Sequence, residues 1–171
     1  MVDYQTLSIV LTGIGMIIAL TYYGLQIRNQ NKTRQAQLYM QIFSQLNSTD
    51  KWREYLEILL ELEWDDYIDF QKKHGVGNLD TYAKINALWW NFTTVGNLLL
   101  DNLIDRKQVY NLLGPMAIDQ WNKWEPIIVA LRKRIETPEA YSSFEYLARE
   151  MRKLKDEGYA ERLIESRFSL K

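Results

Sequence analysis

The feature that most constrains this chain is an uncharged run of 19 residues, LSIVLTGIGMIIALTYYGL, at positions 7–25. As an α-helix the run would be about 28 Å long, close to the thickness of the hydrocarbon core of a bilayer. A helix satisfies its own backbone hydrogen bonds, which is the condition that lipid imposes on any segment crossing it. The run therefore predicts a transmembrane anchor over residues 1–27, with the lipid bilayer as its partner.

Two other kinds of segment share this composition, a cleaved signal peptide and a buried core helix. A signal peptide needs basic residues before its apolar core and a small-residue cleavage site after it. Here residues 1–4 contain no Lys or Arg, and the run ends in TYYGL at 21–25. Buried core helices are typical of shorter apolar runs of about 10–14 residues. Length and flanks favour the anchor over both.

The charges beside the run predict its orientation. Only Asp3 precedes it, whereas Arg28, Lys32 and Arg34 follow it. Because Lys and Arg are enriched on the cytoplasmic side, we expect a single-pass protein of the cell membrane with its N-terminus outside. Residues 28–171 are then cytoplasmic.

The predicted anchor has one stripe of small residues, formed by Ser8, Thr12, Gly15 and Ala19 at helical spacing. Small residues let two transmembrane helices approach closely, so the stripe is a candidate oligomerisation face. Small residues are also common in anchors that do not associate. The stripe is therefore compatible with a homo-oligomer and with an ordinary anchor.

The remainder of the chain is expected to be all-α. The whole chain has only three Pro and eight Gly, and helix-forming residues dominate. The polar stretch 28–37 is a helical stalk or a flexible linker, and residues 38–157 form a cytoplasmic bundle of five to seven helices. Residues 158–171 are expected to be weakly ordered. The net charge of −1, with mixed signs along the helices, argues against nucleic-acid binding.

Local signals predict several boundaries within the bundle. Gly114-Pro115 should close one short helix, and Pro126 should kink or split the next. Thr137 should cap a further helix, with Pro138 at its first position. Asp80 should cap the helix over 81–103.

That helix contains an uncharged stretch, INALWWNFTTVGNLLL at 85–100, which indicates a central helix buried on nearly all sides. Polar and aromatic residues of this helix and of a later one could line a pocket or a partner surface. The candidates are Asn86, Trp89, Asn91, Asn97 and Trp121.

No motif predicts catalysis. Acidic residues cluster at 50–70, but the Glu-x-x-His pairs of di-metal carboxylate bundles are missing, and His74 is the only histidine. There is no Cys for a thiolate site, no nucleophile elbow and no glycine-rich phosphate loop. We therefore predict no catalytic residue, no metal site and no cofactor.

The stretch from Asn91 to Met151 contains VGNLLLDNLIDRKQVYNLLG, WNKWEPIIVALRKR and PEAYSSFEYLAREM. These segments resemble a family of small prokaryotic membrane-anchored proteins catalogued only as a domain of unknown function. The resemblance implies an N-terminal span followed by a helical domain, and it brings no assigned catalytic or binding residues.

These observations lead to two hypotheses of different classes. The first is a membrane-anchored, non-enzymatic interaction or scaffold protein that self-associates or serves as an accessory subunit of a membrane complex. The second is a ligand-sensing or enzymatic helical domain whose pocket is lined by the central helix. The sequence specifies neither the partner nor a small-molecule ligand.

Overall fold

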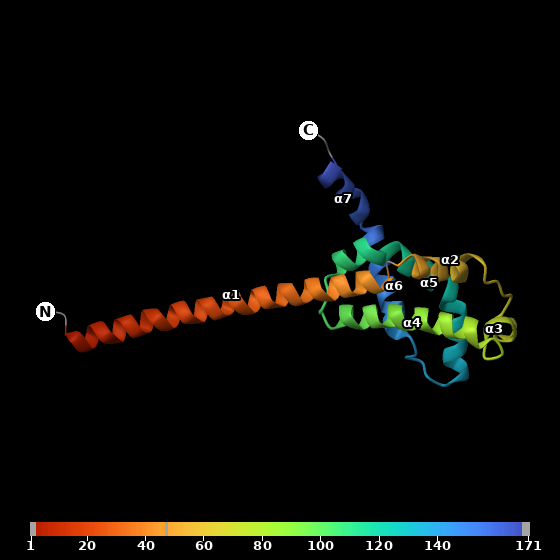
Figure 1. Ribbon diagram of the computed structural model, residues 1–171, viewed down its shortest axis with the longest axis horizontal. Coiled ribbons are helices and arrows are strands. Elements are labelled where there is room, and N and C mark those ends of the chain that lie inside the picture. Colours follow the sequence, from red (N-terminus) through yellow and green to blue (C-terminus); the bar gives the residue numbers. More distant parts are fainter. Residues whose placement is uncertain (1–2, 47, 169–171) are drawn as a thin grey trace. The chain divides into compact units, whose positions relative to one another are not determined.

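The computed structural model describes residues 3–46 and 48–168, which contain seven helices and no strand (Figure 1). The helices are α1 (Tyr4–Leu46), α2 (Thr49–Leu60), α3 (Tyr67–His74), α4 (Leu79–Leu100), α5 (Arg106–Arg134), α6 (Ser142–Asp156) and α7 (Tyr159–Phe168). The prediction of an all-α fold is confirmed. The chain divides into two compact units, Met1–Leu38 and Tyr39–Lys171.

The first unit consists of most of α1. Its apolar part is long and apolar enough to cross a membrane, and none of the residues in that window is buried within the chain. Nine large apolar side chains between positions 7 and 20 are each 48–72% exposed. Residues 28–37 lie within α1 and are helical.

The second unit is built around α4, α5 and α6, and α6 packs against both of the others. Phe144, Leu147, Ala148 and Met151 place one face of α6 entirely out of solvent. Their spacing of three, one and three residues puts them on a single stripe of the helix. The same helix has charged residues on its opposite side, so it buries one face against the core and exposes the other.

The prediction that the central helix is buried on nearly all sides is wrong. α4 buries one stripe, which includes Ile85, Trp89 and Phe92, but Trp90 is 60% exposed and Asn91 is also exposed. The exposed side carries Asn, Thr and Ala instead of charged residues. The prediction failed because it took the lack of charged residues as a sign of burial. The outer face of α4 over 85–100 is uncharged and nevertheless exposed.

The prediction that Gly114-Pro115 closes a helix is also wrong, and Pro126 does not split one. Both prolines lie inside the continuous helix α5. Each proline removes a backbone hydrogen bond, but Leu113, Ala117 and Trp124 are almost completely buried on the same helix. This packing outweighs the lost bonds, and Figure 1 shows that α5 changes direction along its length, as proline in a helix produces.

Several helix starts have a local side-chain cap. Ser48, Asp66 and Asp105 each accept a hydrogen bond from a backbone N–H of the first turn, as expected for N-caps. The predicted cap Asp80 is wrong by two residues, because Asn78 accepts from the Thr81 N–H and α4 begins at Leu79.

The helix predicted to start at Pro138, with Thr137 as its cap, begins four residues later, at Ser142. Thr137 instead starts a turn, with its carbonyl accepting from the Ala140 N–H and its hydroxyl donating to the Ile135 carbonyl. Tyr141 precedes the helix in a left-handed conformation with φ of 59°. Its ring packs edge-on against Trp89 at 5.2 Å between centroids, so a long-range contact moves the start of the helix.

Candidate interaction surfaces

The predicted oligomerisation face lies on the exposed side of α1. Ser8, Thr12, Gly15 and Ala19 share one face and are all exposed, and no other group lies within 4 Å of a Cβ placed on Gly15. The Thr12 hydroxyl donates to the Ser8 carbonyl at 2.8 Å, so it needs no partner outside the helix. The face is smooth and internally satisfied, as close contact with a second helix requires.

The helical domain is organised around an aromatic cluster centred on Trp124, which has no exposed surface. Its ring stacks on Trp64 at 4.7 Å and meets Trp89 edge-on at 5.3 Å. Phe70 packs edge-on against it at 5.8 Å. The Trp124 Nε1–H donates to the Gln120 Oε1 at 2.7 Å, so the ring is held in both position and orientation.

Of the candidate pocket residues, Trp89 and Trp121 lie in the core, but with different neighbours. Trp89 belongs to the Trp124 cluster, whereas Trp121 packs edge-on against Phe144 at 5.2 Å. The Arg132 guanidinium lies over the Trp121 ring, with its Cζ 5.9 Å from the ring centroid. Both tryptophans therefore have structural roles in the packing of α4, α5 and α6.

The three asparagines of α4 point to different surroundings. The Asn86 Nδ2 donates to the Tyr82 carbonyl at 2.7 Å, and its Oδ1 accepts from the Tyr141 hydroxyl at 3.3 Å. The Asn97 Oδ1 accepts from the Ser143 hydroxyl, which connects α4 to α6. Asn91 is exposed and lines a cleft between α2 and α4. The structure therefore distributes the five candidates over separate contacts.

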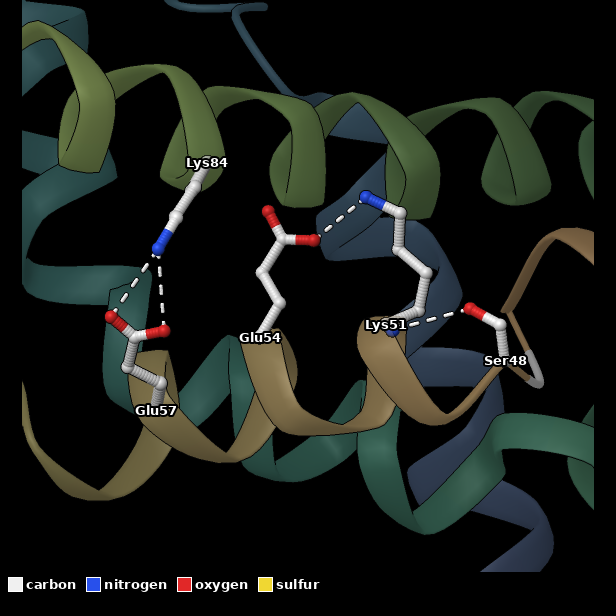
Figure 2. A network of polar contacts seen from close by, with 5 residues as sticks. All are labelled: Ser48, Lys51, Glu54, Glu57 and Lys84. Atoms are coloured by element: carbon white, nitrogen blue, oxygen red, sulfur yellow. Dashed lines mark hydrogen bonds and ion pairs between the residues drawn. The ribbon is translucent and has the colours of Figure 1, made fainter.

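The cleft beside Asn91 is lined by apolar residues, which include Ile58 and Phe92, and by charged ones. Figure 2 shows the charged residues of α2 and α4 that pair beside it. Lys84 of α4 lies 3.3 Å from both carboxylate oxygens of Glu57 on α2, and Lys51 pairs with Glu54 at 2.7 Å. The cleft encloses about 30 Å³, which is room for roughly two water molecules. Glu54 and Glu57 are both paired with lysines.

The sequence analysis did not identify the partner that this acidic helix face has on α4. The available signal was Lys84, the only cation between residues 74 and 105. A lone Lys in an otherwise neutral helix has a strong reason to face a neighbouring acidic helix, and here it connects α2 to α4.

A second contact missed from sequence is made by Lys123 of α5. Its Nζ donates to the carbonyls of Leu59 and Leu62, at 2.5 and 2.8 Å, and lies 5.1 Å from the centre of the Trp64 ring. The last carbonyls of a helix lack intrahelical donors, so this ammonium satisfies the end of α2. Burial lowers the pKa of Lys123 below 10.5, and the Glu63 carboxylate offsets part of that shift.

Tyr141 provides a prediction for the pH dependence of stability. Burial raises the pKa of its hydroxyl above 10.0, and the Tyr82 hydroxyl nearby raises it further. The folded state therefore holds a proton that the unfolded chain releases near pH 10. The resulting stabilisation is fully present below pH 10 and is lost as the pH rises through the folded pKa.

We expect Tyr141→Phe to lose less stability than the parent when the pH is raised above 10. Denaturant unfolding followed by far-UV circular dichroism at pH 8 to 11.5 measures the difference. Lys123 and Tyr55 also have shifted pKa values, but they are the same in both proteins and cancel. Parallel losses of stability in the two proteins would contradict the assignment.

Residues 3–46 and 48–168 contain no cluster of three or more His, Asp or Glu side chains that could hold a metal ion. His74 ends α3, where its Nε2 lies 3.2 Å from the Glu63 carbonyl, and its ring packs near those of Trp64 and Phe70. Its surroundings are those of a packed helix end.

Comparison with known proteins identifies a family without assigning an activity. No curated protein and no solved structure matches the chain significantly. One family model matches residues 9–151, which covers most of the apolar part of α1 and the helical domain through most of α6. The chain therefore belongs to the family described as a domain of unknown function, DUF4760.

Proposed function

We propose that this chain is a membrane-anchored, non-enzymatic interaction protein. α1 serves as a single transmembrane span, and the helical domain is a cytoplasmic module that joins further copies or other membrane subunits. One observation carries the proposal: none of the residues described in the apolar part of α1 is buried.

The magnitude of this exposure supports a bilayer as the cover. Burying one large aliphatic side chain is worth roughly 1.5–3 kcal/mol. For nine such side chains that are about half to three-quarters exposed, the total is on the order of 10 kcal/mol. This is comparable with the whole stability of a typical domain, about 5–15 kcal/mol. Such a surface needs an apolar environment, and its length matches a bilayer core.

The orientation rests on charge. Arg28, Lys32 and Arg34 follow the apolar run, and Asp3 precedes it. The domain therefore lies on the cytoplasmic side by the positive-inside rule. Tyr22 and Tyr23 come at the end of the run, at a depth where aromatic residues with a polar tip are enriched.

The cleft between α2 and α4, which Asn91 of the predicted pocket lines, gives little support to a ligand-sensing or enzymatic domain. Pockets that bind drug-sized ligands typically have volumes of about 300–1,000 Å³. The cleft encloses about 30 Å³, and the carboxylates on its rim, Glu54 and Glu57, are paired with Lys51 and Lys84.

The mass of the full chain in lipid nanodiscs tests the proposal. We expect more than one copy per particle, or a co-purified membrane subunit. A monomer that co-purifies with nothing would contradict the interaction role.

If the Ser8–Ala19 stripe contributes, Gly15→Leu should reduce the assembly while the domain stays helical, because a larger side chain separates closely packed helices. Gly13→Leu is the matched control. It adds the same side chain at a site that is equally open but lies off the stripe. If Gly15→Leu and Gly13→Leu form assemblies of the same mass, the stripe is not part of the interface.

A further inference from the structure

The polar part of α1 continues the spacing of the small-residue stripe. Uncharged residues recur at alternating steps of four and three, at Tyr22, Gln26, Asn29, Thr33 and Ala36. We call these five residues the stalk seam. All are exposed, and the same face has a shallow groove edged by Leu25, Gln30, Arg34 and Gln37. Alternation of four and three is the repeat by which two helices supercoil around each other.

The charges of this part of α1 are placed so that two parallel copies do not repel each other. With Gln26 and Thr33 at the a positions and Asn29 at a d position, Arg28 falls at a c position and Arg34 at a b position. Neither is at the a or d positions that meet the other helix, although Arg34 edges the groove. Lys32 falls at a g position, which faces an e position of the other helix, and the residue there is the neutral Gln37. No like charges meet across the seam.

The polar groups of the seam are suited to a partner of the same sequence. The Thr33 hydroxyl donates to the Asn29 carbonyl at 3.1 Å and is satisfied within the helix. Within the part of the chain that the structure describes, the side-chain amides of Gln26 and Asn29 make no hydrogen bond. An amide donates and accepts at once, so two identical amides can pair, and such pairs at seam positions favour parallel, in-register dimers.

The available area shows where this contact can form. From Tyr22 to Ala36 the helix rises about 21 Å and is about 10 Å wide, so two copies would bury roughly 420 Å². Stable protein interfaces in water bury about 1,200–2,000 Å². The seam therefore cannot hold two copies in solution, and it requires chains that are already concentrated and aligned by a common membrane.

We propose that a second copy of this chain packs along the stalk seam, parallel and in register, where α1 leaves the membrane on its cytoplasmic side. The inference rests on the proposed function, because the membrane supplies the common orientation. It assigns self-association to a particular face of α1 beyond the Ser8–Ala19 stripe.

The absence of cysteine from the sequence makes a direct test possible. Single cysteines are introduced into the full chain in native membranes, at Asn29 on the seam and at Asn31 on the opposite side. Disulfides form only when Cβ atoms approach within about 3.5–4.5 Å. Under mild oxidation we expect about tenfold more cross-linked dimer for Asn29→Cys than for Asn31→Cys. Gln26→Cys and Thr33→Cys should behave like Asn29→Cys.

Failure of this inference can be told apart from failure of the proposed function. If the chain sediments with membranes but Asn31→Cys cross-links as well as Asn29→Cys, or if no position cross-links, the seam is wrong and the anchor stands. If the parent chain does not sediment with membranes, the proposed anchor is wrong and the seam fails with it. Both substitutions replace exposed polar residues, so neither should disturb the fold.

Discussion

Replacing Trp124 by alanine is expected to lower the free energy of unfolding of the helical domain by about 3–5 kcal/mol. Trp124 is fully buried at the junction of α3, α4 and α5, where Trp64, Phe70 and Trp89 contact its ring. Truncation leaves a cavity that these large rings cannot fill, and it leaves the Gln120 Oε1 without its donor. Because whole domains are stable by only about 5–15 kcal/mol, partial loss of the fold is expected.

Denaturant unfolding of the full chain in detergent, followed by far-UV circular dichroism, measures this effect. The matched control is Trp90→Ala, which removes the same side chain from the neighbouring helix, where it is 60% exposed. We expect the control to cost about 1 kcal/mol or less. Equal losses for the two variants would contradict the central place of Trp124 in the core.

Gly96→Ala is expected to destabilise the domain by about 1–3 kcal/mol, although alanine favours a helix over glycine by about 1 kcal/mol. Gly96 is buried where α4 crosses α6, and a Cβ placed on it would collide with the backbone carbonyl of Ser143. Backbone cannot move aside as a flexible side chain can, so α4 and α6 must separate. The Ser143–Asn97 hydrogen bond next to the contact would be strained as well.

Two effects of Gly96→Ala on stability have opposite signs: alanine favours the helix, whereas its Cβ collides with the Ser143 carbonyl. The sign of the measured change therefore shows which effect is larger. If the contact between α4 and α6 were loose, helix propensity alone would make the variant more stable than the parent. Gly77→Ala in the loop before α4 is the control, since a Cβ added there would have no other group within 4 Å. A shift of the unfolding midpoint to higher denaturant for Gly96→Ala would contradict the close packing of the two helices.

Features that depend on one segment alone could be predicted from the sequence. The apolar helix follows from residues 7–25, because a run without charge needs no information from other parts of the chain. The caps Ser48, Asp66 and Asp105 follow for the same reason, since each bonds to backbone only two or three residues away.

Features that depend on tertiary packing could not be predicted. Local rules end helices at Pro115 and start one at Thr137, but the buried side chains of α5 and the contact of Tyr141 with Trp89 override them. Residues far apart in sequence make the important polar contacts of the domain. Lys123 donates hydrogen bonds to carbonyls 61 and 64 residues earlier in the chain, and no local sequence pattern predicts such a partner.

The candidate surfaces divide in the same way. Spacing alone predicts that Ser8, Thr12, Gly15 and Ala19 share one helix face, and all four are exposed. Their role in oligomerisation stays a prediction. The proposed pocket could not be assessed from spacing, because asparagines of one helix turned to Tyr141, to Ser143 and to solvent. Which side of α4 faces the core was decided by α5 and α6.

Extraction of membranes with alkaline carbonate tests the central claim most directly, because it strips peripheral proteins and leaves transmembrane ones. We predict that the full chain remains in the membrane pellet. Replacing both Ile14 and Ile17 by Lys should release it, because each charge at the centre of a span costs about 2.5–3.5 kcal/mol. Recovery of the unmodified chain in the carbonate supernatant would contradict a transmembrane α1 and the interaction role built on it.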